Sequence, residues 1–407
     1  MTVYRGLPPS RPIEIEKVLN DVINIIDLVK SRGDAALREL TLKFDGINLE
    51  RIALDRDALR ECCKDVDSRV AKAVEKLFDV LYEFHKNTLP KDVIVNVGGI
   101  NMGYLWRSIY SVGVYVPGGK KTYPSTLLMA GVPAKIAGVK KIYVASPPMT
   151  SACVNPIVAY TAQLLEVEEV YNVGGAQAIA ALAYGTESVK KVDKIVGPGN
   201  IYVQAAKFAV QNVVSIDGIE GPTELVVIAD ESSNAEFVAL DMMAQAEHGK
   251  GTFVVLLTNS DRIASEVATI LEKDVSHDFY IVKVDSIDSA VNIANELAPE
   301  HLSLHVSNPQ KYIGRIVNAG AISVGTEPPT LIDYVGPNHI LPTNRWARSR
   351  GALSIYDFLK PVSVIFDSAN IDDKVLEAVL TLARYEGFEA HSQSVETRYG
   401  GRVKRTV

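Results

Sequence analysis

The strongest constraint on the fold is an alternation of short β-branched runs with helical segments between residues 112 and 211. The runs VGVYV, KKIYVA, EEVYNV and VDKIV each lead into a loop with glycine or proline, and helical patterns such as NPIVAYTAQLLEV separate them. This order is typical of parallel strands joined by crossover helices, whose ligands collect at the carboxyl ends of the strands. The sequence therefore predicts an α/β fold around a parallel sheet.

A second series of strands and helices starts at Glu224 with ELVVIAD, TFVVLLT, FYIVKVD, HLSLHV and AISVG, which indicates a pseudo-repeat. Residues 11–110 read mostly as helices, and the tail beyond about Pro342 is too small to fold alone. We expect two Rossmann-like parallel-sheet domains with helical N-terminal and C-terminal extensions. The expected boundaries are an arm at 1–28, a first α/β domain at 29–110 plus 222–341, a second at 111–221, and a C-terminal extension at 342–407.

The bulk properties of the 407-residue chain exclude some classes of function. A net charge of -7 provides no basic field for a nucleic-acid backbone. The N-terminus lacks the apolar region of a secretion signal, and no uncharged apolar run reaches the ~18 residues of a membrane helix. The three cysteines, Cys62, Cys63 and Cys153, contain no C-x-x-C pair, which favours a reducing cytoplasm.

Six of the seven histidines follow residue 247, so we look for metal-binding and proton-transfer residues in the second half of the chain. Gln245 and His248 stand three apart near the end of a predicted helix, so their side chains can share one ligand. The alternative is a helix end capped by a histidine. Asp333 can equally be a solvated loop residue, and His391 can equally interact with a helix dipole. A zinc site requires these distant residues to converge.

The adjacent residues Glu300 and His301 provide two proton-transfer groups in the loop before a predicted strand. The alternative is a charged entry to that strand. His305 alternates into the same strand and is expected to be a packed or surface residue, while His277 lies in a polar turn. Neither is given a role.

No G-x-G-x-x-G fingerprint follows a strand, but three glycine loops occupy equivalent strand ends. They are YVPGG from Tyr115, GGAQ ending at Gln177, and GPGN ending at Asn200. Glycine allows close approach of a ligand, the tyrosine can pack against a ring, and the amides can bind ribose or base edges. Their repetition along one sheet edge favours an elongated ligand.

Eight ordered segments between about Asp21 and Arg398 resemble the signatures of the histidinol dehydrogenase family. They are VGVYVPGG, VGGAQAIAALAYGT, KIVGPGN, EGPTELVVIAD, DMMAQAEHG, NELAPEHLSLHV, DYVGPNHILPT and LARYEGFEAHSQSVE. The resemblance implies oxidation of L-histidinol through the aldehyde to L-histidine, the last step of histidine biosynthesis. It also implies two NAD used in succession and one zinc ion per subunit.

The resemblance further assigns residues to the site of a homodimer. It implies that zinc is bound by Gln245, His248, Asp333 and His391. Substrate contacts are implied for Thr223, Gln245, His248, His301, Asp333, His339, Glu386 and His391. NAD contacts are implied for Tyr115, Gln177 and Asn200. The partner subunit would supply His391 and Glu386.

The chemistry of the implied reaction suggests separate proton-transfer roles for Glu300 and His301. An alcohol becomes a carboxylate through two hydride removals with a hydration between them, so two bases are needed. We expect His301 to accept the alcohol proton and Glu300 to activate the water. No cysteine lies in these motifs, which disfavours a thiohemiacetal route. Zinc would orient the substrate nitrogens, and Glu386 would balance the substrate ammonium.

Three departures from the family pattern surround the expected site. The segment from Asp333 to His339 is one residue short, and Ile332 stands where glycine is common. Asn344 and Arg345 replace the usual glycine pair.

Two rival functions remain open. One is a relative that oxidises another amino or sulfonated alcohol with the same zinc and NAD, although the presence of Glu386 and His339 favours histidinol. The other is a non-catalytic protein that keeps zinc as a clamp between subunits, which would not need the Glu300–His301 pair. A zinc hydrolase is disfavoured because H-E-x-x-H is absent.

Overall fold

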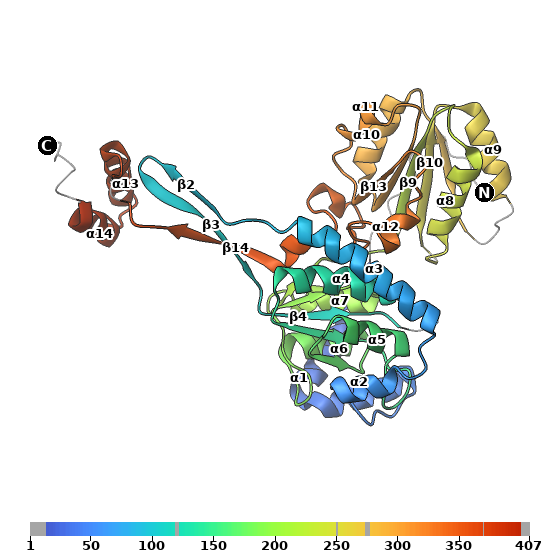
Figure 1. Ribbon diagram of the computed structural model, residues 1–407, viewed down its shortest axis with the longest axis horizontal. Helices are drawn as coiled ribbons and strands as arrows, with labels where there is room; N and C mark the ends of the chain where they lie inside the picture. The colour runs from blue at the N-terminus through green and yellow to red at the C-terminus, as the bar shows by residue number, and fades with distance from the viewer. Residues whose placement is uncertain (1–13, 119–121, 250, 273–276, 369, 400–407) are drawn as a thin grey trace. The chain divides into compact units, whose positions relative to one another are not determined.

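The computed structural model describes residues 14–118, 122–249, 251–272, 277–368 and 370–399. The chain divides into two compact units, one from Met1–Leu89 with Ile109–Phe358 and the other from Pro90–Ser108 with Leu359–Val407 (Figure 1). The first unit contains two sheets. The second contains a smaller sheet and two helices.

A six-stranded sheet with the order β1-β6-β5-β4-β7-β8 forms one half of the first unit. Its strands are β1 (Ala53–Leu54), β4 (Ser111–Tyr115), β5 (Lys141–Ala145), β6 (Glu169–Tyr171), β7 (Lys194–Val196) and β8 (Ser215–Ile216). All neighbours pair in parallel except β1 with β6. The connecting helices are α4 (Pro124–Ala137), α5 (Pro156–Leu164), α6 (Gly175–Tyr184) and α7 (Ile201–Val210). The chain winds outward from β4 in one direction and then in the other, so a topological switch point lies between β4 and β7.

A five-stranded, wholly parallel sheet with the order β11-β10-β9-β12-β13 forms the other half. Its strands are β9 (Glu224–Ala229), β10 (Phe253–Thr258), β11 (Tyr280–Lys283), β12 (His301–His305) and β13 (Ala321–Val324). Its helices are α8 (Ala235–Ala246), α9 (Asp261–Leu271), α10 (Ile287–Leu297) and α11 (Gln310–Ile313). The winding repeats that of β4 to β8, which confirms the predicted fold of two Rossmann-like sheets.

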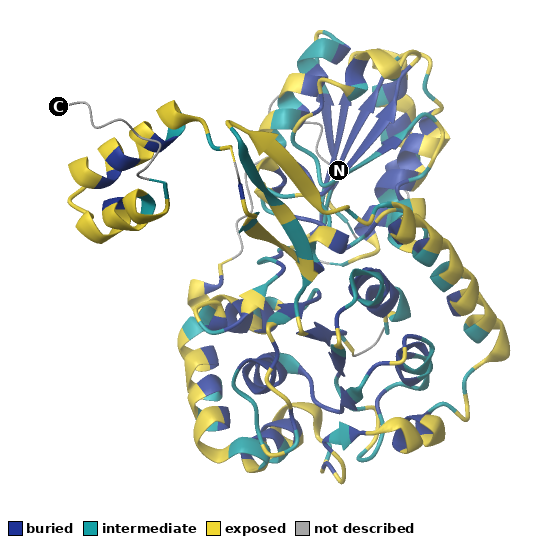
Figure 2. Cartoon of the chain, turned by 60° about the vertical axis from the view of Figure 1, so that its left-hand side comes forward, coloured by how far each residue is buried: buried dark blue, intermediate teal, exposed yellow. Residues whose placement is uncertain are grey.

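Burial on both faces explains why these strands are continuous apolar runs. The interior of β9 is inaccessible to solvent, and Figure 2 shows the strands of the five-stranded sheet as buried. Crossover helices cover both faces of a parallel sheet, so a polar side chain inside a strand would lose its water. Polar residues are therefore restricted mainly to the strand ends.

The N-terminal helices belong to the six-stranded sheet, which differs from the expected grouping of 29–110 with 222–341. β1 pairs with β6, and α1 (Glu16–Asp45) packs on α6 and α7. The apolar stripe of α1 shares a core cluster with Tyr115 and Tyr171. The expected boundary at residue 28 lies inside α1, whose change of direction occurs at Gly33 (φ 50°, ψ -128°). α2 (Arg56–Cys62) and α3 (Ser68–Asn87) pack on α5 and α4.

The second unit corrects two further expectations. Residues predicted as helical form the hairpin β2 (Val93–Val97) and β3 (Ile100–Ser108), which turns at two glycines with φ of 59° and 78°. Such paired left-handed residues match the twist of a hairpin, so the Gly98–Gly99 pair was an available signal. The tail does not pack as one extension from 342. Its strand β14 (Leu359–Ile365) pairs with β3, and α13 (Asp373–Tyr385) and α14 (Glu389–Tyr399) follow.

Three short elements lie between β13 and β14 in the chain. They are α12 (Thr330–Tyr334) and the 3₁₀ turns η1 (Trp346–Arg348) and η2 (Ile355–Phe358). η2 ends at Phe358, which is fully buried and belongs to the first unit. Residues 342–358 therefore complete the core of the first unit instead of starting the extension.

The cysteines form a link that was not expected. Cys62 at the end of α2 is joined by a disulfide to Cys153, 91 residues later. The absence of a C-x-x-C pair therefore did not exclude a disulfide in this chain. Cys63 is a half-buried thiol, and burial raises its pKa to about 11. Among the described residues, none of the helices has the length and apolar character needed to cross a membrane.

Burial of His85 makes the folded state sensitive to acid. The side chain is 2% exposed on α3, and burial lowers its pKa from 6.5 to about 4. An unfolded chain binds the proton more readily, so the stability from neutral His85 is complete above pH 6.5 and is lost as the pH falls through about 4. We expect protonation of His85 to cost the wild-type protein roughly 1–3 kcal/mol of unfolding free energy over this range. His85→Leu should not show this loss. Urea unfolding of both proteins at several pH values measures this, and parallel pH dependences would contradict it.

Candidate functional site

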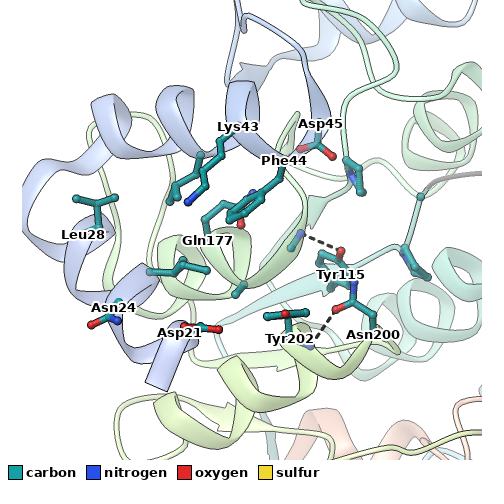
Figure 3. Close-up of a pocket in the computed structure, with 17 residues that line it drawn as sticks. Asp21, Asn24, Leu28, Lys43, Phe44, Asp45, Tyr115, Gln177, Asn200 and Tyr202 are labelled. Atoms are coloured by element: carbon teal, nitrogen blue, oxygen red, sulfur yellow. Dashed lines mark hydrogen bonds between the residues drawn. The ribbon is translucent and has the colours of Figure 1, made fainter. Parts of the chain in front are cut away.

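A cavity of about 810 Å³ lies at the carboxyl edge of the six-stranded sheet, beside its switch point (Figure 3). Tyr115, Gln177 and Asn200 line it together, although they lie at or beyond the ends of three different strands. α1 closes the cavity with polar and aromatic side chains that include Lys43 and Asp45. The structure thus brings the three expected cofactor residues together, and their contact with NAD stays a prediction.

Two helix N-termini shape this cavity. The Gly175 N–H at the start of α6 donates to the Tyr115 hydroxyl over 3.0 Å, which leaves the hydroxyl proton free for a ligand. Asn200 caps α7 by accepting hydrogen bonds from the N–H groups of Tyr202 and Val203 (3.0 and 3.1 Å), as Figure 3 shows for Tyr202. Its side-chain NH₂ group is then available as a donor. N–H groups at helix N-termini also suit anionic groups such as a pyrophosphate.

The second group of candidate side chains lies at the amino edge of the five-stranded sheet. Glu224 begins β9 and His301 begins β12, and the parallel register places Glu300 beside Glu224. α8 runs back from the carboxyl edge of β9, so its last turn brings Gln245 to the same edge. Crossover helices return to the start of the next strand, which explains this convergence.

A chain of hydrogen bonds connects Gln245 to Glu300. The Gln245 side-chain amide donates to the Thr223 hydroxyl, and that hydroxyl donates to Glu300 Oε2. The same carboxylate oxygen accepts the Glu224 N–H over 2.9 Å. Burial raises the pKa of Glu300 to about 8, although these hydrogen bonds oppose the rise. Glu300 therefore takes up and releases a proton near neutral pH.

His301 is held neutral in the same place. It is 2% exposed, and burial lowers its pKa to about 3, with a smaller contribution in the same direction from His248 and His339. Its Nε2 lies 3.6 Å from Asp333 Oδ1. Burial raises the pKa of Asp333 to about 7. A neutral imidazole beside a carboxylate has the composition of a general base and its stabilising partner.

His339 contacts Asp333 despite the shortened segment between them. Its Nδ1–H donates to the Asp333 carbonyl oxygen over 2.6 Å, which leaves Nε2 to accept from the Thr126 hydroxyl at 3.3 Å. Burial lowers the pKa of His339 to about 4. Asp333 lies on the short helix α12 instead of in the expected loop. His248 influences the pKa values of both His301 and His339, so it belongs to the same cluster.

Glu386 and His391 lie in the second unit. There they line one groove of about 640 Å³ between α13 and α14, together with exposed apolar side chains such as Leu382 and Phe388. Across the described ranges, no three His, Cys, Asp or Glu side chains are grouped to hold a metal ion. The expected ligands other than His391 are Gln245, His248 and Asp333, all in the first unit, and zinc binding by the set stays a prediction.

Comparison with known proteins gives a consistent result. A family model described as histidinol dehydrogenase matches residues 10–399. The histidinol dehydrogenase of Saccharolobus solfataricus is 52% identical over 395 residues, covering 97% of this chain and 99% of the relative. That of Sulfolobus acidocaldarius is 53% identical over 394 residues, covering 97% and 98%. The chain belongs to the histidinol dehydrogenase family. The crystal structure of the Elizabethkingia anophelis family member matches with a TM-score of 0.90 at 33% identity, covering 98% of this chain and 94% of that one.

The backbone at Asn344 and Arg345 adopts a conformation that favours glycine. Asn344 and Arg345 both adopt left-handed backbone conformations, with φ of 52° and 66°. Glycine adopts this conformation without strain, whereas other residues need compensation. Here the Asn344 N–H donates to Glu224 Oε1 over 2.9 Å, and the Arg345 guanidinium donates to the Glu296 carbonyl oxygen. These contacts help to hold both residues in the left-handed conformation.

Glu224 is a site residue that the sequence reasoning missed. One carboxylate oxygen accepts the Asn344 N–H and the other accepts the Glu300 N–H over 3.2 Å. Burial raises its pKa to about 7. A charged first residue in the otherwise apolar run ELVVIA was the available signal. The expectation for His305 is confirmed, because it is packed in β12 with Nε2 2.9 Å from Asp241 Oδ2.

Proposed function

We propose that this protein oxidises L-histidinol through L-histidinaldehyde to L-histidine, the final step of histidine biosynthesis, with two NAD and one zinc ion per subunit. The observation that carries the proposal is the buried cluster in which neutral His301 and titratable Glu300 meet Gln245, Thr223 and Asp333. Membership of the histidinol dehydrogenase family supports the same substrate.

The donor atoms fit zinc. A carboxylate, an imidazole and a carboxamide are oxygen and nitrogen ligands of the kind zinc binds, and burial of Asp333 without a cation raises its pKa. Gln245, His248 and Asp333 would hold the ion together with His391 of the partner subunit. When bound, zinc supplies a positive charge that orients the amine and imidazole nitrogens of the substrate.

His301 is the proposed base of the first oxidation. Its low pKa keeps the imidazole neutral at physiological pH, so a ring nitrogen can accept the hydroxyl proton as hydride leaves the same carbon for NAD. The Asp333 carboxylate at 3.6 Å stabilises the imidazolium that results. Thr223 and His339 are proposed to contact the substrate from the same cluster.

Glu300 is the proposed base of the second oxidation. In its ionised form it removes a proton from the water that adds to the aldehyde carbon, which gives the hydrate with one oxygen ionised. A second hydride then leaves for a second NAD, and loss of the remaining proton gives the carboxylate. Cys62 and Cys153 are bonded to each other and Cys63 has a raised pKa, so none of the three provides a thiolate nucleophile.

NAD is proposed to lie in the cavity with Tyr115, Gln177 and Asn200. The donors of the cavity suit its polar groups: the free hydroxyl proton of Tyr115 and the NH₂ group of Asn200, next to the positive dipole ends of α6 and α7. Phe44 and Tyr202, which are 52% and 42% exposed at the cavity, provide aromatic surface for a base.

A homodimer is proposed because the second unit exposes apolar surface that a second copy can cover. Val93, Val95 and Val97 of β2 and Ile365 of β14 are each about half exposed or more, and Tyr385 of α13 is 88% exposed. Figure 2 shows β2 and most of α13 and α14 as exposed. Glu386 and His391 lie in this same unit. Each copy would place them in the site of the other, where Glu386 binds the substrate ammonium.

A cytoplasmic location is proposed from the biosynthetic function.

The stoichiometry of NADH production tests the proposed function. Purified protein is expected to form two NADH for each L-histidinol consumed, to lose activity with a chelator and to regain it with zinc. Absorbance of NADH together with quantification of L-histidine measures this. Other amino alcohols and sulfonated alcohols serve as comparison substrates, and a higher kcat/KM with one of them, or a ratio of one NADH, would contradict the proposal.

The role of Glu300 is tested by Glu300→Gln. The variant is expected to slow oxidation of L-histidinaldehyde by about 10²–10⁴-fold and oxidation of L-histidinol to the aldehyde much less. Because the ionised form is the base, the wild-type aldehyde step should accelerate as the pH rises through about 8, and the variant should lose this dependence. Glu231→Gln, at the opposite edge of the same sheet, is the control. A larger effect on the alcohol step would refute the division of roles.

Mixing two inactive variants tests the exchange of His391 between subunits. His391→Ala and His301→Asn are each expected to be inactive as homodimers. After unfolding and refolding together in equal amounts, half of the dimers are mixed and each has one intact site, so about a quarter of wild-type activity should return. Recovery of no activity, with mixed dimers confirmed by mass spectrometry, would show that His391 acts within its own chain.

A further inference from the structure

A buried ion pair lies beneath the loop that begins at Gly197. Lys207 of α7 and Asp217, which follows β8, approach to 2.5 Å between Nζ and Oδ1. Their side chains are 0% and 1% exposed. Neither residue lines the cavity at the carboxyl edge of the sheet.

Both members of the pair bind the same glycine. Lys207 Nζ donates to the Gly197 carbonyl oxygen over 3.0 Å. The Gly197 N–H donates to Asp217 Oδ2 over 2.6 Å. The other oxygen of Asp217 accepts the Gly218 N–H over 2.9 Å. The two backbone polar groups of Gly197 therefore depend on one ion pair.

Gly197 also joins two of the loops that form the cavity. Its φ of 119° is unfavourable for other residues, and a Cβ at this position would lie 2.2 Å from the Tyr115 carbonyl oxygen. The loop is thus packed directly on the end of β4. It continues to Asn200, which caps α7 and lines the cavity.

Stability alone does not explain a charged pair at this position. Val203, Ala206 and Val210 of α7 are fully buried near the pair, and Gln204 is the other buried polar side chain of this helix. Removing two charges from water is costly, and well-packed apolar residues of similar volume are often at least as stabilising. What apolar residues cannot provide is a donor and an acceptor for Gly197 in this conformation.

We propose that Lys207 and Asp217 are positioning residues for the dinucleotide. They hold Gly197 against the end of β4 and so keep Asn200 and the N-terminus of α7 in place at the cavity. This inference rests on the proposed binding of NAD in that cavity. Both residues act through Gly197 and touch no reacting atom.

Lys207→Met tests the proposal, with Lys194→Met as the matched control. Lys194 also donates to a backbone carbonyl, that of Asp357 at 2.8 Å, but from the amino end of β7. We expect Lys207→Met to raise the Kd for NAD by about tenfold or more while the KM for L-histidinol at saturating NAD changes less than about twofold. Lys194→Met should leave the Kd for NAD unchanged.

Hydrogen exchange of the cofactor-free protein provides a second measurement. The peptide covering Gly197–Asn200 should exchange faster in Lys207→Met than in the wild type, whereas peptides from the five-stranded sheet should not change. An unchanged Kd for NAD, or equal increases in the Kd for NAD and the KM for L-histidinol, would overturn the proposal. If Lys207→Met does not fold, the Kd for NAD and the KM for L-histidinol are measured for Asp217→Asn instead, with the same results expected. Failure of the wild-type protein to bind NAD would instead refute the proposed function.

Discussion

Burial of both faces of two parallel sheets is the constraint on which the rest of the molecule depends. Parallel strands require crossover helices, and these cover the sheet on both sides, so side chains in the middle of β4 or β9 lie in an apolar core. Polar chemistry is therefore confined mainly to the strand ends and to the loops that follow or precede them. Every site residue of the first unit lies at such an end, in a connecting loop or on an adjoining helix.

The two candidate sites lie at opposite edges of their sheets. The cavity with Tyr115 and Asn200 lies at the carboxyl edge, beside the switch point of the six-stranded sheet. Glu300 and His301 lie at the amino edge of the five-stranded sheet, where α8 delivers Gln245. Because the segment from Asp217 to Glu224 connects the sheets, contacts along it matter to both sites. Asp217 holds the loop of the first site, and Glu224 holds Glu300 in the second.

Burial away from water shifts the pKa values of the titratable groups around Glu300 and His301. Withdrawal from water disfavours the charged form of each group, so the pKa values of Glu300 and Asp333 rise while those of His301 and His339 fall. The carboxyl groups consequently titrate near neutral pH, and the imidazoles remain neutral acceptors. Hydrogen bonds from Thr223 and from the Glu224 backbone limit the rise for Glu300. The arrangement suits two successive proton removals better than a single one.

The amino-acid sequence by itself determined the two parallel sheets, because buried strands and crossover helices have periodicities that are visible locally. It also determined which residue types stand at the strand ends, including Glu300, His301 and the three glycine loops. Only the tertiary structure decided that α1 joins the six-stranded sheet, that residues 102–108 pair with the tail, and that Cys62 meets Cys153. These contacts join segments far apart in the chain, and the apolar stripe of a helix does not specify which of two similar cores will bury it. The roles of Glu224 and of the Lys207–Asp217 pair likewise depend on three-dimensional proximity, since their partners are backbone groups that carry no signature in the sequence.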